Sequence, residues 1–359
     1  MFELTNDQRK CFALKPVSDQ WERVEVKPGP YDNFKTYFYI DGNEIVKCIL
    51  SGPNNYCEYE LSEKITSDRK YLLPKTERGK PTPLTSPNLL KRKGVGMRLA
   101  SSYKSSISVY NNNTDCFYYF NGYKVDEIFD FNTFYDWVEK WCRETTDVDL
   151  DDIVRFSKQK RRHVQYKEGD IFRFKIGRRL YGYGRILLDY DKMRKKKEPF
   201  WDIFMLKPLV CSVYHIVTDR KDVTIDELEP LLSLPSLFIA DTQIYYGENE
   251  IIGNIPISQN EDYQIMYGNS IAFREKAVCY QCGKTFRKIE NDSELFSGFL
   301  NNSLNMNSFN FTLDILLDCI RENSNNPYWA KYYSCTVESD LRNPKHSDKL
   351  QLIRDQFNL

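Results

Sequence analysis

The sequence predicts an α+β protein with a β-rich N-terminal domain, a small curved β-barrel-like middle domain and a helical C-terminal region. Aromatic residues make up 14% of the 359 residues, with 25 Tyr and 22 Phe, and these residue types favour strands. Apolar and polar residues alternate over much of the chain up to about residue 275, whereas apolar stripes at helical spacing follow. We therefore expect domains at residues 1–150, 160–278 and 279–359.

Two hairpins are expected in the N-terminal domain. Residues 35–50 contain apolar runs on both sides of Asp41-Gly42, and an Asp-Gly pair between strand-like runs is a strong hairpin signal. Residues 106–125 repeat this pattern, with a turn at residues 111–115. Residues 76–97 are rich in Pro and basic residues, which predicts a loop or an edge segment.

A helix is predicted to close this domain over residues 132–144. Phe134, Trp137, Val138 and Trp141 fall on one face at helical spacing, and Asn132 is placed to cap the N-terminus. The acidic sequence that follows indicates a linker or a connecting helix over about residues 145–165.

The middle domain is expected to be built from strands. Apolar and polar residues alternate from Ile171 to Ile186, which indicates half-buried strands. Gly177, Gly182 and Gly184 permit a sharp turn and a strongly curved strand. Residues 223–234 suggest a short helix with Thr224 as its cap, and residues 236–257 suggest two more strands.

Helices are predicted in the C-terminal region. Apolar residues recur at helical spacing in residues 293–304, 311–323 and 347–359. In the last of these segments, Leu350, Ile353 and Phe357 form the stripe.

A glycine-based motif in the middle domain resembles the immunity protein 26 family of bacterial polymorphic toxin systems. The resemblance covers about residues 165–275 and is carried by Gly169, Asp170, Tyr181, Gly182, Gly184 and Arg185. It implies a cytoplasmic, non-enzymatic protein that binds and neutralises a cognate toxin, and many such toxins are nucleases. Apart from the resemblance, Gly182 and Gly184 either bend a strand or allow a partner to approach the backbone closely. Arg185 is either an anchor at an interface or an ordinary exposed residue of a strand.

The charges are segregated along the chain although the formal net charge is zero. Residues 219–262 hold ten acidic residues and two basic ones. An acidic surface suits a basic nuclease, because complementary potentials accelerate association. The alternative is that acidic and basic stretches balance each other on one surface. The proposed partner-binding residues are Asp222, Asp226, Glu227 and Glu229.

Nucleic-acid binding or a role in anti-phage defence is the alternative function. Residues 155–197 contain sixteen Lys or Arg residues and few acidic ones, interleaved with aromatic residues. Phosphates are contacted by Lys and Arg, and unpaired bases stack on aromatic rings. The zero net charge of the whole chain weighs against this alternative.

The sequence gives little support for a metal site or an enzyme. Cys279 and Cys282 have the spacing of a zinc knuckle, but a second ligand pair is missing from the sequence. No common catalytic motif is found, so we expect no cofactor and no enzymatic activity. The start of the chain lacks the pattern of a signal peptide, and the ten Cys are scattered, which is typical of a cytoplasmic protein.

Overall fold

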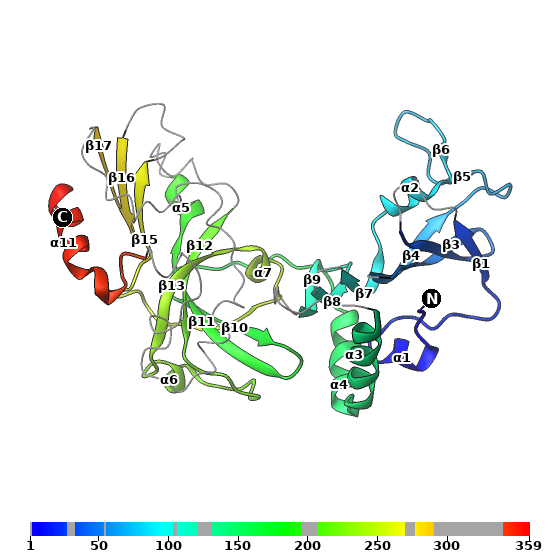
Figure 1. Cartoon of the computed structure of the whole chain (residues 1–359), viewed down its shortest axis with the longest axis horizontal. Helices are drawn as coiled ribbons and strands as arrows, with labels where there is room; N and C mark the ends of the chain where they lie inside the picture. Colours follow the sequence, from blue (N-terminus) through cyan, green and yellow to red (C-terminus); the bar gives the residue numbers. More distant parts are fainter. Residues whose placement is uncertain are drawn as a thin grey trace. The chain divides into compact units, whose positions relative to one another are not determined.

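The computed structural model describes residues 2–26, 33–53, 55–102, 106–120, 131–195, 207–269, 277–290 and 340–359 (Figure 1). The chain forms two compact units, Met1–Arg162 and His163–Leu359. Both units combine antiparallel sheets with helices, so the predicted α+β class is confirmed. None of the described helices is long and apolar enough to cross a membrane.

The first unit is built on a seven-stranded antiparallel sheet. Gly42, with φ +57°, lies in the turn between the second and third strands, as the Asp-Gly signal predicted. The predicted turn at residues 111–115 joins the last two strands. In sheet order the strands are β1 (Glu22–Val26), β2 (Lys35–Asp41), β3 (Glu44–Ser51), β4 (Tyr56–Lys64), β7 (Val95–Ser102), β8 (Ser106–Asn111) and β9 (Cys116–Phe120).

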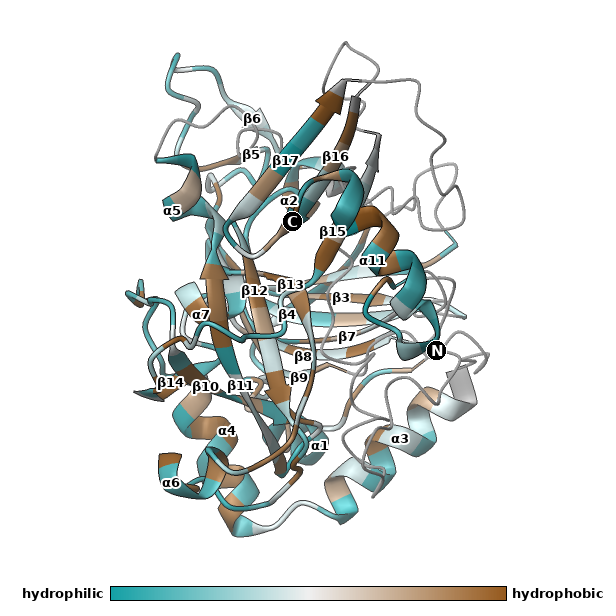
Figure 2. Ribbon diagram, turned by 90° about the vertical axis from the view of Figure 1, so that its left-hand side faces the viewer, coloured by the Kyte–Doolittle hydropathy of each residue, from teal (hydrophilic) through white to brown (hydrophobic). Residues whose placement is uncertain are grey.

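Helices and the N-terminal segment bury one face of this sheet. The predicted helix is α3 (Phe131–Arg143), and its Phe134, Val138 and Trp141 are buried as expected. Figure 2 shows apolar and polar bands alternating along α3. Asn132, the expected cap, lies inside the helix because the described helix already includes Phe131. The other two helices of this unit on this face are α1 (Asn6–Lys10) and α4 (Asp147–Ser157).

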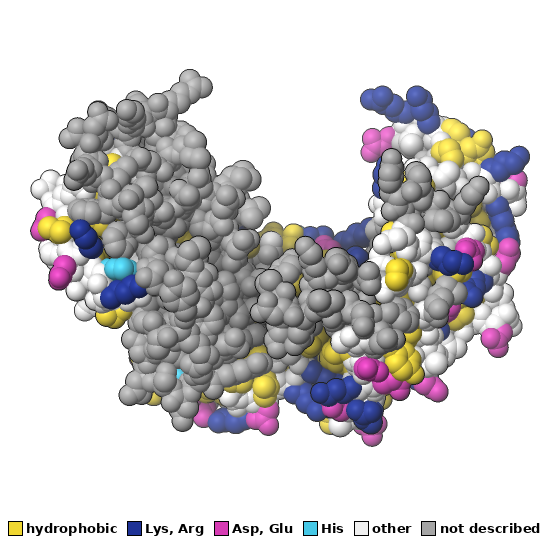
Figure 3. Space-filling model, in the orientation of Figure 1, with side chains coloured by type: hydrophobic (Ala, Val, Ile, Leu, Met, Phe, Trp, Pro, Cys, Tyr) yellow, Lys and Arg dark blue, Asp and Glu magenta, His cyan; other side chains and the backbone are white. Residues whose placement is uncertain are grey.

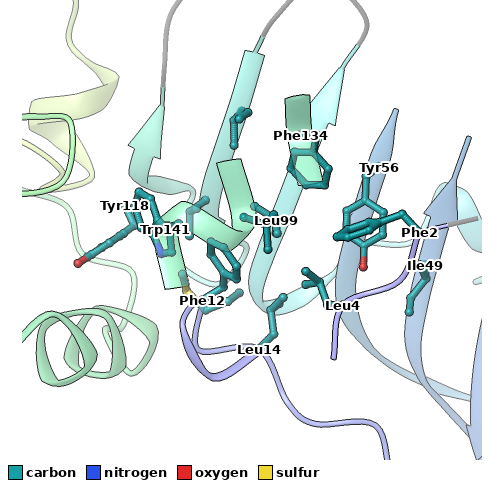
Figure 4. Close-up of a cluster of buried hydrophobic side chains, with 14 of the residues drawn as sticks. Phe2, Leu4, Phe12, Leu14, Ile49, Tyr56, Leu99, Tyr118, Phe134 and Trp141 are labelled. Atoms are coloured by element: carbon teal, nitrogen blue, oxygen red, sulfur yellow. The ribbon is translucent and has the colours of Figure 1, made fainter. Parts of the chain in front are cut away.

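Figure 4 shows the resulting core, in which Phe2 of the N-terminal segment meets Tyr56 of the sheet and Phe134 of α3. Phe12 of the same segment stacks on Trp141 of α3. The opposite face has a second core around Phe38 and Leu61. The Pro-rich segment lies on that face and contains short elements, which are α2 (Ser86–Leu90) and β6 (Thr82–Pro83), the latter paired with β5 (Tyr71–Leu72).

A charge cluster lies inside the core beneath α1. Glu58 is fully buried, and its carboxylate accepts hydrogen bonds from Arg9 Nε at 2.8 Å, Lys47 Nζ at 2.5 Å and Tyr56 Oη at 2.6 Å. Lys47 Nζ also donates to the Lys15 carbonyl at 2.6 Å. Because Arg9 belongs to α1 and Lys15 follows it, the cluster fixes the N-terminal segment on the sheet.

Replacing Glu58 is expected to destabilise the first unit strongly. Glu58→Gln removes the counter-charge of two buried cations, and breaking a buried ion pair costs about 3–5 kcal/mol. Urea unfolding followed by Trp fluorescence measures this loss. The matched control is Asp7→Asn, which removes an exposed pair with Lys10 and should leave the midpoint unchanged. Equal midpoints for both variants would contradict the structural role of the cluster.

The same cluster predicts a dependence of stability on pH. Burial by itself would raise the pKa of the Glu58 carboxyl. The positive charges of Lys47 and Arg9 outweigh this effect and hold the pKa below its usual value. A lowered folded-state pKa stabilises the fold above the ordinary carboxyl pKa, and that stability is lost as the pH falls through the lowered pKa. The unfolding midpoint of the native protein should therefore fall on acidification more steeply than that of Glu58→Gln, measured between pH 7 and the acid transition.

The second unit contains a strongly curved five-stranded sheet. Leu234 of one edge strand and Ile251 of the other pack on the same core as Ile186 of the central strand, which requires the sheet to curve around that core. The two edge strands do not pair in the described part of the chain, so the predicted barrel-like domain is an open, curved sheet. In sheet order the strands are β13 (Ser233–Ala240), β12 (Pro208–Tyr214), β11 (Leu180–Asp189), β10 (Asp170–Ile176) and β14 (Glu250–Asn254).

Short helices connect these strands. The helix predicted after Thr224 is α6 (Ile225–Leu228), and Thr224 caps it through a capping box, as expected. The two strands predicted within residues 236–257 are β13 and β14, which a short unpredicted helix separates. The remaining helices here are α5 (Tyr190–Arg194) and α7 (Thr242–Tyr245).

A three-stranded sheet follows, made of β15 (Ile265–Asn269), β16 (Ala277–Cys282) and β17 (Thr285–Glu290). Strand structure therefore continues beyond residue 279, where the sequence analysis expected the helical region to begin. The hairpin between β16 and β17 turns at Gly283, which has φ +56° and directly follows the two cysteines that were considered as metal ligands.

The last predicted helix is present as α11 (Ser347–Gln356), after a 3-10 turn at Pro344–His346. Ile353 and Phe357 pack against Tyr267 and Tyr280 of the three-stranded sheet. The helices predicted at 293–304 and 311–323 lie outside the described residues.

Candidate functional site

The glycine-based motif begins with a tight turn into β10. Gly169 has φ +90°, and an added Cβ would lie 2.5 Å from the Ile255 carbonyl oxygen. Asp170 is buried and accepts hydrogen bonds from the Lys167 amide and from Asn254 Nδ2, both at 2.8 Å. These contacts attach the start of β10 to the end of β14.

Gly182 and Gly184 make room for two aromatic rings. Phe174 pairs with Gly182 across the β10–β11 ladder, and Phe172 pairs with Gly184. A Cβ at Gly182 would lie 2.3 Å from Phe174 Cζ, and one at Gly184 would lie 2.5 Å from Phe172 Cζ. The outer ends of the rings therefore cover the glycines, and both rings belong to the core inside the curved sheet.

Arg185 makes its contacts within the chain. Its Nε donates to the Ile255 carbonyl at 3.2 Å, and its Nη2 donates to the Pro256 carbonyl at 2.5 Å. The same guanidinium forms an ion pair with Glu261 at 3.0 Å, and both side chains are 12% exposed. Arg185 thus fastens the segment after β14 to β11.

Two tyrosines of the motif region position the loop that precedes α6. The backbone of Tyr181 exchanges hydrogen bonds with that of Thr218, at 2.7 and 3.1 Å. Tyr183 Oη donates to the Arg220 carbonyl at 2.8 Å. Arg173 of β10 donates to the Lys221 carbonyl, and its guanidinium lies 5.4 Å from the Tyr181 ring centroid.

This loop and α6 form the acidic segment, defined as residues 219–229. All four proposed partner-binding residues lie in it and are exposed, as are Asp219, Arg220 and Lys221. Arg220 forms ion pairs with Asp222 at 3.2 Å and with Glu227 at 2.8 Å. Hydrogen bonds from Arg220 and Thr224 lower the pKa of Glu227 to about 2, so this carboxylate is charged at neutral pH.

Asp226 and Glu229 differ from these two carboxylates. Within the described residues, neither side chain forms a hydrogen bond or an ion pair. The helix that carries Asp226 is held by Ile225, which packs on Gly253 of β14 so closely that a Cβ added at Gly253 would lie 2.0 Å from Ile225 Cδ1. The acidic segment is therefore held on the curved sheet by apolar and backbone contacts, while its carboxylates face solvent.

The segment that contains these features can be assigned by comparison. Residues 167–277 match the Immunity protein 26 family model. The resemblance stated for about residues 165–275 is thereby confirmed. No curated protein and no solved structure matches the chain. An immunity-protein family implies a non-enzymatic role for this part of the chain.

The two cysteines with zinc-knuckle spacing lie on opposite sides of β16. Cys279 packs with Leu188 and Phe238, whereas Cys282 packs against the core that contains Tyr267. A spacing of three on a strand directs side chains to opposite faces. Burial raises the pKa of Cys279 to about 11, which favours the neutral thiol. Within the described residues, no group of His, Cys, Asp or Glu is arranged to hold a metal ion.

The basic stretch at residues 155–197 is divided between the two units. Several of its cations are paired inside the second unit, including Arg173 with Glu250, Arg185 with Glu261 and Lys195 with Asp191. Its first part, Lys158–Arg162, belongs to the first unit and is exposed. Arg173, Tyr183 and Arg220 organise the acidic segment, and no local pattern in the sequence identifies Arg173 and Tyr183, because their partners lie far along the chain.

The ring-on-glycine packing predicts the effect of adding one methyl group. Gly182→Ala should destabilise the second unit by about 1–3 kcal/mol, because the new Cβ overlaps the Phe174 ring. Thermal unfolding of the full-length protein measures the loss. The double variant Gly182→Ala with Phe174→Leu tests whether the Phe174 ring causes this loss. Its loss of stability should be smaller than the sum of the losses in the two single variants. Strict additivity would show that the ring is not the obstacle.

Proposed function

We propose that this protein binds and neutralises a cognate bacterial toxin through the acidic segment. The observation that carries the proposal is the match of residues 167–277 to the Immunity protein 26 family, in the same part of the chain as the acidic segment. An immunity protein of this kind acts by binding, and the second unit offers a fixed, exposed, charged surface for it.

The charge of this surface indicates the class of toxin. Five carboxylates and two cations lie within residues 219–229, and one of the cations, Arg220, is already paired with two of the carboxylates. A negative surface steers a positively charged partner and raises the association rate. Nucleases carry positive charge where they contact phosphates, so a basic nuclease is the partner that we propose.

The rigidity of the segment also supports binding. The backbone of residues 218–221 is held by Tyr181, Tyr183 and Arg173, and α6 is held by the contact of Ile225 with Gly253. A surface that is ordered before association loses less conformational entropy when the partner binds.

Reversing two charges should abolish protection without damaging the fold. Asp226→Lys with Glu229→Lys changes carboxylates that have no described partner, so the melting temperature should stay near that of the native protein. Affinity for the toxin encoded next to the gene should fall about tenfold or more, mainly through slower association. Surface plasmon resonance with the purified toxin, and survival on co-expression, are the measurements.

The matched control carries the same charge change on the other unit. Asp19→Lys with Glu77→Lys also replaces two exposed carboxylates and should leave affinity and protection intact. Cells that die on co-expression of native protein and toxin, with no complex formed, would refute neutralisation itself. Full protection by the Asp226 and Glu229 variant would instead refute the acidic segment as the contact surface.

A further inference from the structure

Three aromatic rings lie side by side on the first unit, outside the segment that matches the family. Tyr110 and Phe117 pair across the β8–β9 ladder, with ring centroids 4.9 Å apart, and Phe120 lies 5.1 Å from Phe117. Phe117 is 36% exposed, and the other two rings are half-buried. Because Val109 beside Tyr110 points into the core under α3, these rings occupy the opposite face of the sheet.

Cations border these rings. Arg98 of β7 pairs with Tyr110 across the ladder and is exposed. Asp115, in the turn between β8 and β9, accepts a hydrogen bond from Tyr110 Oη at 3.0 Å. The same carboxylate forms ion pairs with Lys93 at 3.1 Å and with Arg161 at 3.0 Å. Asp115 therefore holds two cations next to the aromatic rings.

A second contact places the basic run Lys158–Arg162 at the same end of the sheet. Asn111 is fully buried at the end of β8, and its Nδ2 donates to the carbonyls of Phe156 and Ser157, at 2.9 and 3.3 Å. These carbonyls end α4, so the chain leaves the helix beside the β8–β9 turn. The next five residues, KQKRR, are all exposed. In the view of Figure 3, Lys and Arg side chains form several groups over the described surface of this unit, interspersed with Asp and Glu.

We propose that this aromatic–basic surface binds single-stranded nucleic acid. The surface is defined by Tyr110, Phe117, Phe120, Lys93, Arg98, Arg161 and the run Lys158–Arg162. Unpaired bases stack on exposed rings whatever their sequence, and Lys and Arg contact the phosphates between them. A duplex keeps its bases stacked on each other, so it can use the cations but not the rings.

The function proposed for the second unit does not require this activity. The proposed toxin contacts lie within residues 219–229 of the second unit, whereas every residue of the aromatic–basic surface lies in the first unit. The balanced net charge of the chain is compatible with local binding, because the cations are gathered at one end of one sheet.

The test is the binding of fluorescein-labelled oligothymidine and oligouridine, each about 20 nucleotides long, to the full-length protein by fluorescence anisotropy. We expect binding of both strands, with affinity that falls as salt rises. Phe117→Ala should weaken binding about fivefold or more through the loss of stacking. Lys158→Glu with Lys160→Glu should weaken it about tenfold or more and flatten the salt dependence.

Matched controls use the same unit. Tyr135→Ala removes a 44% exposed ring from α3, on the other face of the sheet, and Lys140→Glu reverses an exposed charge on that helix. Both should bind like the native protein. Anisotropy that does not change at low salt would overturn the proposal. Binding that Phe117→Ala leaves unchanged, or a duplex of the same length bound as tightly, would show that charge alone acts and would also overturn it.

Discussion

The packing of two phenylalanine rings on two glycines is the interaction on which the architecture of the second unit depends. Phe172 and Phe174 occupy the volume that side chains at Gly184 and Gly182 would need, so the centre of the core lies directly on the backbone of β11. The sheet curves around these rings, and both edge strands reach the same core. With β11 fixed in this way, Tyr181, Tyr183 and Arg185 are directed toward the segments that they hold. The two glycines of the motif therefore build the core of the second unit, and the acidic segment that this core supports lies elsewhere in the sequence.

The first unit depends on a different kind of interaction. Its core contains one carboxylate and two cations. Burying these charges would destabilise the fold unless each charge were paired. Glu58, Arg9 and Lys47 satisfy one another, and the arrangement ties the beginning of the chain to the middle of the sheet. The opposite face of that sheet carries the aromatic–basic surface, whose order depends on Asn111 and Asp115 at the β8–β9 turn. In both places, polar groups that bind several partners at once hold together segments that are distant in the sequence.

Local patterns predicted most of the elements, because strands, turns and caps are set by neighbouring residues. The Asp41-Gly42 hairpin, the helix with Phe134 and Trp141, and the Thr224 cap are examples. Contacts between distant residues could not be predicted in this way. The partners of Arg185 are some 70 residues away, and the pairing of Lys47 with Glu58 depends on strand register. The hairpin at Gly283 was missed because Cys279 and Cys282, which come just before it, suggested a metal site.

Residues 218–221, in the loop before α6, are held largely through their main chain, whereas the side chain of Val223 is buried in the core. Tyr183 and Arg173 bind carbonyl oxygens of Arg220 and Lys221, and Tyr181 pairs with the backbone of Thr218. Peptide groups are the same whichever side chains they carry, so these anchors do not restrict the amino acids between them. Such a scaffold can accept new side chains at residues 219–221 while the path of the backbone is retained, so the chemistry of this exposed surface can change without any change in the core.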